Sequence, residues 1–455
     1  MFRKDIAALR EWKNSANRKP LILNGIRQVG KTWLLKEFGR LEYENTVYVN
    51  FEENPAFAEF FTTSKDVSRI IANLSMAFAE PIRPETTLLI LDEIQECPAA
   101  LTALKYFCEN ASEYHVAAAG SLLGIMLAKP ASFPVGKVEF LTIHPLTFTE
   151  FLRADNAENL ARYLESIEDI EPIPAAFFQP LNEKLKMYLI TGGMPEAVLE
   201  WVSTGDIMRA DKILSQILLA YERDFAKHMT PKDFPKATLI WNSVPSQLAR
   251  ENKKFIYRAV KEGARAREYE DALTWLSDAG LIYKIFRSSK PGLPISAYDD
   301  ISAFKLYLAD VGLLRCLSGL HPSAFSEGSR LFSEFKGSLT ENYVLQALIT
   351  QFSSIPRYWA VDNPHYEVDF LIQFENLVLP VEVKAGENVA GRSLQKYAER
   401  FSEETPLRIR FSLQNLTLDG NLLNIPLCLA DLSGKCISLA LKGKTPSLQS
   451  IEIEK

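Results

Sequence analysis

The chain has 455 residues, of which 47% are hydrophobic and 24% charged, and its formal net charge is −6. These values are those of a globular protein long enough for about two to four domains, and they exclude a chain that coats nucleic acid with positive charge. The five cysteines include no Cys-x-x-Cys pair, and the N-terminal segment lacks the apolar core of a signal peptide. We therefore expect a cytoplasmic protein without disulfides or a membrane segment.

The first informative segment is a phosphate-binding loop. It reads Gly25-Ile26-Arg27-Gln28-Val29-Gly30-Lys31-Thr32 and matches G-x-x-x-x-G-K-[ST] at every fixed position. An apolar strand precedes it and an apolar helical stripe follows it, which is the context that this motif requires. The loop N–H groups would cradle phosphate oxygens, with Lys31 acting on the β- and γ-phosphates and Thr32 on Mg²⁺. The motif therefore predicts a site for ATP and Mg²⁺.

Two carboxylates directly follow a second buried strand, which we expect over residues 87–91. Asp92 is suited to hold Mg²⁺, and Glu93 to orient or deprotonate an attacking water. The pair could instead cap a helix that begins near Ile94, because acids favour helix N-termini. A strand over residues 115–119 is followed by Ser121, which could sense the γ-phosphate or could be a turn serine.

Further strands over residues 46–51 and 138–143 complete a parallel α/β sheet. The pattern then becomes mostly helical from residue 156 to residue 226. Three short helices are expected next, followed by a strand over residues 281–286 and a Pro-Gly turn: 243–249, 254–262 and 269–279. Three helices followed by a β-hairpin is the order of a winged helix.

The segment from residue 250 to residue 267 has a local excess of positive charge. It holds seven basic residues against two acidic ones: Arg250, Lys253, Lys254, Arg258, Lys261, Arg265 and Arg267 against Glu251 and Glu262. Such side chains could grip DNA phosphates, as in helix-turn-helix modules. They could also form an ordinary solvated face, and four acidic residues of the next helix would repel DNA: Glu268, Glu270, Asp271 and Asp278. DNA contact and a protein-packing role both stay open.

The C-terminal part carries carboxylates on predicted strands over residues 367–372 and 378–384. Alternation places Glu382 and Lys384 on one strand face, with Asp369 nearby if the two strands form a hairpin. Glu341 lies on a preceding helix. Converging carboxylates and a lysine can hold Mg²⁺ and activate water against a phosphodiester. The same Glu-x-Lys pattern is also common on a solvated strand face.

Together these motifs resemble a family of prokaryotic AAA+ ATPases whose phosphate loop reads G-x-R-Q-V-G-K-T. Four further segments match in family order: 91–95, 145–151, 192–195 and 306–314. The C-terminal part of that family is similar to restriction endonucleases of the PD-(D/E)xK type, and Glu341-Asn342, 368–370 and 381–384 match that pattern. Many such domains serve only in binding. Relatives often carry an arginine that acts on a neighbouring subunit's nucleotide where this chain has Lys137, so the oligomeric state stays open.

The resemblance implies an Mg²⁺-dependent ATPase of four parts. These are an AAA+ core (1–155), a helical lid or linker (156–234), a winged helix (235–320) and a nuclease-like α/β domain (321–455). Two functions are compatible with them. In the first, nucleotide state controls engagement of DNA, with or without cleavage. In the second, the chain is an ATP-dependent switch for a protein partner, and its nuclease-like fold is inert.

Overall fold

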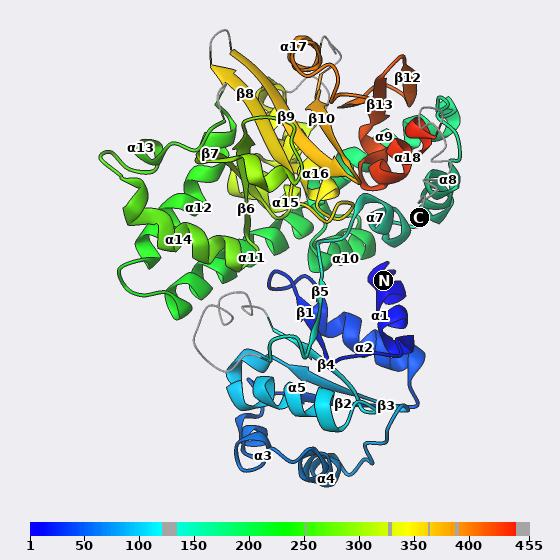
Figure 1. Ribbon diagram of the computed structural model, residues 1–455, viewed down its shortest axis with the longest axis vertical. Helices are drawn as coiled ribbons and strands as arrows, with labels where there is room; N and C mark the ends of the chain where they lie inside the picture. The colour runs from blue at the N-terminus through cyan, green and yellow to red at the C-terminus, as the bar shows by residue number, and fades with distance from the viewer. Residues whose placement is uncertain (121–133, 251–252, 326–329, 363–364, 387–390, 443–455) are drawn as a thin grey trace, which may run out of the picture. The chain divides into compact units, whose positions relative to one another are not determined.

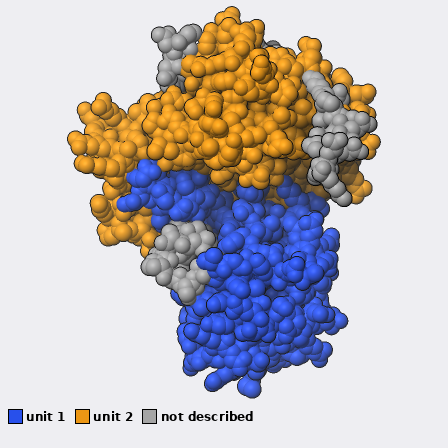
Figure 2. Space-filling view, viewed as in Figure 1, with its two compact units in different colours: residues 1–145, 270–282 blue, residues 146–269, 283–455 orange. Residues whose placement is uncertain are grey.

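The computed structural model describes residues 1–120, 134–250, 253–325, 330–362, 365–386 and 391–442 (Figure 1). It falls into two compact units (Figure 2). The first unit holds residues 1–145 and 270–282, and the second holds residues 146–269 and 283–455. No helix in the described part of the chain is both long and apolar enough to cross a membrane.

A five-stranded parallel sheet is the framework of the first unit, with the spatial order β2-β3-β4-β1-β5. Its strands are β1 (Leu21–Asn24), β2 (Asn45–Asn50), β3 (Thr87–Asp92), β4 (His115–Ala119) and β5 (Glu139–Thr142). Every residue of β3 is buried, which explains why its sequence is a continuous apolar run. The predicted parallel α/β fold is confirmed.

Helices connect these strands and bury the sheet. They are α1 (Asp5–Asn14), α2 (Lys31–Glu42), α3 (Glu59–Thr62), α4 (Val67–Phe78) and α5 (Pro98–Asn110), with the 3₁₀ turns η1 (Pro55–Ala58) and η2 (Ile94–Glu96). Val49, Leu91 and Ala118 of three adjacent strands belong to one buried apolar cluster with Leu104 of α5. The residues between β1 and α2 form the predicted phosphate-binding loop, so the carboxyl end of β1 leads directly into it.

The chain returns to the first unit at Glu270, near the start of helix α14 (Ala266–Asp278). Gly280 follows this helix in a left-handed conformation, with φ +73°, which favours glycine at a helix end. A Cβ atom at Gly280 would lie 3.2 Å from Cγ2 of Ile26. The turn after α14 therefore packs against the phosphate-binding loop.

The second unit contains an eight-stranded mixed sheet in the order β12-β13-β11-β10-β9-β8-β6-β7. Its strands are β6 (Ile282–Ser288), β7 (Asp299–Leu308), β8 (Arg357–Asp362), β9 (His365–Phe374), β10 (Leu377–Val383), β11 (Arg408–Ser412), β12 (Thr417–Asp419) and β13 (Leu422–Pro426). Strand β9 pairs antiparallel with β8 and β10, whereas β10 and β11 are parallel.

Helices make up most of the remaining second unit. The longer ones are α7 (Phe148–Ala154), α8 (Glu158–Ser166), α9 (Ala175–Thr191), α10 (Pro195–Thr204), α11 (Ile207–His228), α12 (Phe234–Leu248), α15 (Val311–Leu317), α16 (Arg330–Leu348), α17 (Arg392–Arg400) and α18 (Ser433–Leu441). The shorter ones are α13 (Tyr257–Val260), η3 (Ile295–Tyr298), η4 (Pro322–Phe325) and η5 (Leu427–Leu432).

The expected order of three helices and two strands is present as α12, α13, α14, β6 and β7. However, β6 lies beside β8, so these two strands extend the C-terminal sheet. Helix α12 begins earlier than expected because Pro235 lies in its first turn, where proline is favoured. Helix α13 is shorter than expected because the Phe255 N–H donates to the Phe304 carbonyl of β7 (2.7 Å). The winged-helix assignment and the four-part division stay predictions.

Three of the matched motifs meet in one buried hydrogen-bond network. The Asn342 side chain accepts from the N–H of Leu308 (2.9 Å) and donates to its carbonyl (3.0 Å). Gln346, one turn further along α16, donates to Asp310 (3.2 Å), and Asp310 accepts from the N–H of Gly193 (2.7 Å). Because each of these buried groups would be costly if unpaired, the motifs at 192–195 and 306–314 and Asn342 have structural roles.

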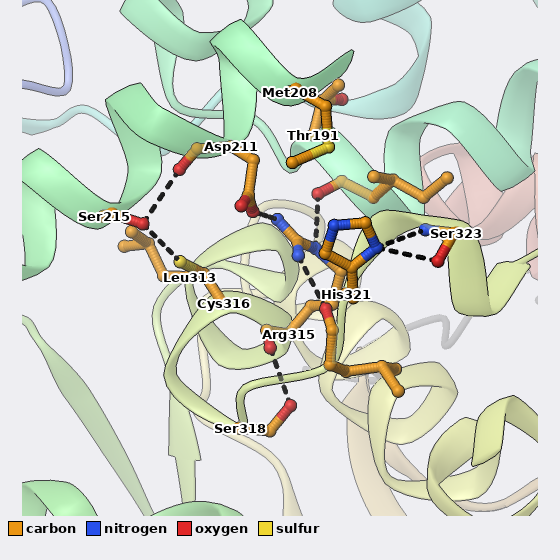
Figure 3. A network of polar contacts seen from close by, with 12 residues as sticks. Thr191, Met208, Asp211, Ser215, Leu313, Arg315, Cys316, Ser318, His321 and Ser323 are labelled. Carbon is orange, nitrogen blue, oxygen red and sulfur yellow. Dashed lines mark hydrogen bonds and ion pairs between the residues drawn. The ribbon is translucent and has the colours of Figure 1, made fainter.

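A second buried network surrounds Arg315 of α15 (Figure 3). Its guanidinium donates to the carbonyls of Ile190 (2.9 Å) and Leu320 (2.8 Å) and pairs with Asp211. Arg315 is only 1% exposed, so these partners compensate for the loss of its hydration. They join the end of α9, helix α11 and the segment after α15.

Candidate nucleotide-binding site

The phosphate-binding loop has the backbone conformation that close wrapping requires. Gly25 and Gly30 have φ values of +140° and +95°, and Gln28 also has a positive φ of 65°. A Cβ atom at Gly25 would lie 2.3 Å from the carbonyl oxygen of Ile143, so only glycine fits there. Helix α2 begins immediately after Gly30, which directs free N–H groups and the positive end of the helix dipole toward the loop.

Lys31 is a buried cation whose ammonium group is hydrogen-bonded to backbone carbonyl oxygens. Its Nζ donates to the carbonyls of Gly25 (2.7 Å) and Ile26 (3.0 Å), and the residue is 7% exposed. Burial lowers the pKa of Lys31 to about 8, although the charges of Glu93 and Asp92 act in the opposite direction. A phosphate group would supply the negative charge that this ammonium group lacks.

Asp92 at the end of β3 joins the loop to the sheet. Its Oδ2 atom accepts hydrogen bonds from the Thr32 hydroxyl (2.8 Å) and from the Tyr48 hydroxyl (2.8 Å). A hydroxyl and a carboxylate are oxygen donors of the kind that Mg²⁺ prefers. Because these two groups already lie in contact, the residues present fit an Mg²⁺ ion, which Thr32 and Asp92 would hold.

Glu93 has a left-handed backbone conformation, with φ 49° and ψ 46°. This conformation is uncommon in residues other than glycine and is concentrated at functional sites. The Gln95 amide donates to the Glu93 carboxylate. The alternative that Glu93 caps an α-helix loses support, because Ile94 begins the 3₁₀ turn η2 and α5 starts only at Pro98.

Sequence reasoning missed Tyr48 and Asn50 on the neighbouring strand β2. Their only signal was their place near the carboxyl end of a strand that pairs with β3. Two other residues considered in the sequence analysis, Ser121 and Lys137, are not seen at this site. Ser121 lies outside the described residues. Lys137 pairs with Glu109 of the same chain (2.9 Å).

In the second unit, Glu341 is occupied by protein donors. It forms an ion pair with Lys253, and its Oε2 atom accepts from the Tyr307 hydroxyl (3.1 Å). Nearby, Lys305 is completely buried and pairs with Glu367. Two lysine ammonium groups therefore lie among the carboxylates of this region.

The other predicted C-terminal residues have partners of their own. Asp369 Oδ2 accepts from the Val383 N–H (2.7 Å), and burial and the Glu341 charge raise the pKa of Asp369 to about 7. Glu382 pairs with Lys384 (2.9 Å). Asp369 is thus close enough to feel the charge of Glu341, whereas Glu382 forms its ion pair with Lys384. Within the described ranges, no three His, Cys, Asp or Glu residues are grouped as metal ligands.

Comparison with family models gives three matches, none of which covers half of the chain. Residues 17–152 match an AAA domain, residues 182–324 a domain of unknown function (DUF8612), and residues 336–429 another domain of unknown function (DUF4143). The predicted similarity of the C-terminal part to restriction endonucleases is not among these descriptions and stays a prediction.

The chain is also similar to individual proteins. A Haemophilus influenzae protein described as uncharacterized is 22% identical over 283 residues, which are 57% of this chain and 67% of that protein. A Walker-type ATPase of Pyrococcus abyssi is 14% identical with a TM-score of 0.45, over 70% of this chain and 95% of the other. AMPPCP-bound DnaA of Aquifex aeolicus is 14% identical with a TM-score of 0.24, over 60% and 87%. Both TM-scores are below 0.5, so these two structures carry no argument about ligands or partners.

The sheet, the phosphate-binding loop and the AAA domain match together define the first unit as a P-loop domain of the AAA ATPase class. No comparable class follows for the second unit, whose matches are to domains of unknown function.

The low pKa of Lys31 predicts a pH dependence of nucleotide binding. In the free protein its pKa is about 8, and bound phosphate raises this value by stabilising the ammonium form. Between the two values binding takes up a proton, so the affinity falls as pH rises, by up to about tenfold per pH unit. Below the lower value the affinity is flat.

The measurement is the Kd of a non-hydrolysable ATP analogue between about pH 7 and pH 9.5. Lys31→Arg is the matched control, because arginine keeps its proton over this range and its affinity should stay flat. Wild-type affinity that does not change over the same range would contradict the burial of a titrating Lys31.

Proposed function

We propose that this protein is an Mg²⁺-dependent ATPase whose active site is formed by residues 25–32, Asp92 and Glu93. The observation that carries the proposal is the contact between Thr32 and Asp92 (2.8 Å) beside the buried, carbonyl-held Lys31. This arrangement brings a metal-binding pair and a buried cation hydrogen-bonded to neutral carbonyls to the N-terminus of one helix. A glycine-rich surface turn without a ligand would not need these groups to lie together.

Each residue has a distinct proposed role. The loop N–H groups from Gly25 to Gly30 bind phosphate oxygens, and Lys31 exchanges its two backbone carbonyls for the β- and γ-phosphates. Thr32 and Asp92 hold Mg²⁺, which supplies positive charge next to the phosphates. Glu93 accepts a proton from the attacking water, and Gln95 orients its carboxylate.

Replacing Glu93 by glutamine tests the hydrolytic role. The glutamine keeps the shape of the side chain but cannot accept the proton, so we expect the hydrolysis rate to fall roughly 100- to 10,000-fold. Binding of ATP should change little, because Glu93 is not among the residues assigned to the phosphates. Steady-state phosphate release and equilibrium binding measure the two quantities.

Glu96→Gln is the matched control, since Glu96 is an exposed acid three residues further along the chain. Hydrolysis at the wild-type rate by Glu93→Gln would remove Glu93 as the base. Loss of ATP binding in that variant would instead assign it to ground-state binding.

For the second unit we infer a binding role that follows the nucleotide state, without cleavage. A metal-dependent nuclease needs carboxylate oxygens that are available to the cation. Here both oxygen atoms of Glu341 are used, by Lys253 and Tyr307. Glu382 is paired with Lys384 through Oε1 alone, and its buried Oε2 atom has no hydrogen-bond partner among the described residues. The contacts of Glu341 support the alternative in which the nuclease-like region is catalytically inert.

DNA is the candidate partner that a specific observation favours. Five basic residues of the segment from 250 to 267 are exposed: Arg250, Arg258, Lys261, Arg265 and Arg267. Lys253 is not available in the same way, because it pairs with Glu341. Exposed acidic residues lie close by in α14, so any attraction of DNA must come from the segment before Glu268.

Reversing the charge of the exposed basic residues tests whether the partner is DNA or a protein. We expect double-stranded DNA to bind with an affinity that falls steeply with salt, because each neutralised phosphate releases cations. Reversing Arg258, Lys261 and Arg265 to glutamate should abolish this binding. The control reverses three exposed basic residues of the first unit: Lys65, Arg69 and Arg83.

Fluorescence anisotropy of labelled DNA measures both variants at several salt concentrations. Equal loss in the two variants would indicate a non-specific charge effect, and unchanged binding in the first would place any DNA site elsewhere. Absence of binding by the wild type would leave the protein-partner alternative.

A further inference from the structure

The carboxylate of Asp92 is held at both oxygen atoms. Oδ1 accepts from the N–H of Glu93 (3.1 Å), and Oδ2 accepts from the hydroxyls of Thr32 and Tyr48, each at 2.8 Å. Asp92 is only 3% exposed, so few water molecules can replace these donors. Of the two hydroxyls, Thr32 is also assigned to the metal ion, whereas Tyr48 has no other proposed task.

The hydroxyl of Tyr48 is itself fixed in direction. It accepts a hydrogen bond from the Asn50 amide (3.1 Å), which leaves its own proton for Asp92. Asn50 is held in turn by the N–H groups of Glu52 (2.9 Å) and Glu53 (3.0 Å). The ammonium group of Lys36 lies 3.5 Å from the centre of the Tyr48 ring, which fixes the ring from another side.

The two hydrogen bonds of the Tyr48 hydroxyl make it the donor to Asp92 and the acceptor from Asn50. Burial, and then the hydrogen bond to the negatively charged Asp92, raise the pKa of Tyr48 far above its usual value. A neutral tyrosine can only stabilise a carboxylate by donating to it. The Asn50 amide on one side and the Asp92 carboxylate on the other therefore fix the direction of this hydrogen bond.

We propose that Tyr48 is a positioning residue for Mg²⁺ at the nucleotide site. Its hydroxyl keeps the Asp92 carboxylate from rotating, so that Oδ2 stays against Thr32 and the pair presents one fixed arrangement of oxygen atoms to the cation. The inference rests on the proposed ATPase function. It adds a residue of β2 to a site whose other assigned residues lie in or next to the phosphate-binding loop and at the end of β3. Partners that orient metal ligands in this way commonly change metal affinity by about 10- to 100-fold.

Tyr48→Phe removes the hydroxyl and keeps the ring. We expect it to weaken the binding of Mn²⁺, used in place of Mg²⁺, by about 10- to 100-fold in the presence of a non-hydrolysable ATP analogue. Electron paramagnetic resonance of free Mn²⁺ measures this without any turnover. Binding of the analogue in excess EDTA should be unchanged, because Tyr48 is not assigned to the phosphates.

Tyr43→Phe is the matched control. It also removes a hydroxyl hydrogen bond of the first unit, since the Tyr43 hydroxyl lies 2.7 Å from Nδ1 of His115. We expect it to lower the thermal unfolding temperature by an amount similar to Tyr48→Phe and to leave Mn²⁺ binding as in the wild type. A purely structural role of Tyr48 would make the two variants alike in both measurements.

The outcomes separate this inference from the function on which it rests. If the wild type binds the analogue and Mn²⁺ but Tyr48→Phe binds Mn²⁺ equally well, the positioning role is wrong and the ATPase proposal stands. If the wild type binds no analogue, both fail. Should Tyr48→Phe not fold, Asn50→Ala replaces it, since it leaves Tyr48 in place but removes the amide that orients the hydroxyl. It must weaken Mn²⁺ binding in the same direction.

Discussion

Parallel pairing of strands brings their carboxyl ends to the same edge of the first sheet, and the nucleotide site depends on this constraint. The phosphate-binding loop follows β1, Asp92 ends β3, and Tyr48 and Asn50 lie at the end of β2. Because β2 and β3 are paired in register, Asn50 stands opposite Asp92. The hydrogen bond between Thr32 and Asp92 then closes the distance across the intervening strand β4. Three segments far apart in the sequence thus supply one set of polar groups.

The lysines in the interior of the two units have different hydrogen-bond partners, and this difference supports different roles for the units. Lys31 is held by two neutral carbonyls, so a phosphate group can replace these partners with a gain in electrostatic energy. In the second unit the buried Lys305 is paired with the carboxylate of Glu367, and the partly buried Lys253 is paired with the buried Glu341. Breaking such a buried pair leaves an uncompensated charge, which is strongly unfavourable. The first arrangement is prepared for a ligand, whereas the second is already complete.

The sequence predicted most of the first unit because its signals are local. The apolar run before Asp92 and the eight residues of the phosphate-binding loop each lie in one short segment. Tyr48 was missed because it reads as an ordinary strand residue, and its partner Asp92 lies 44 positions away. The pairing of Lys253 with Glu341 spans 88 positions and was missed for the same reason. The joining of β6 to β8 depends on strands from two predicted domains, which no local pattern encodes.

The central claim is that the first unit binds a nucleotide through the charge of Lys31. The direct measurement is equilibrium binding of a fluorescent ATP analogue, with Mg²⁺, to the wild type and to Lys31→Ala. Saturable wild-type binding, weakened by at least about tenfold in the variant, is the predicted result, because the loop N–H groups alone cannot neutralise the phosphates. The thermal unfolding temperature without nucleotide should not fall, since the variant removes a buried charge without an anionic partner among its hydrogen bonds. Equal affinity in the two proteins, or no binding by the wild type, would contradict the claim.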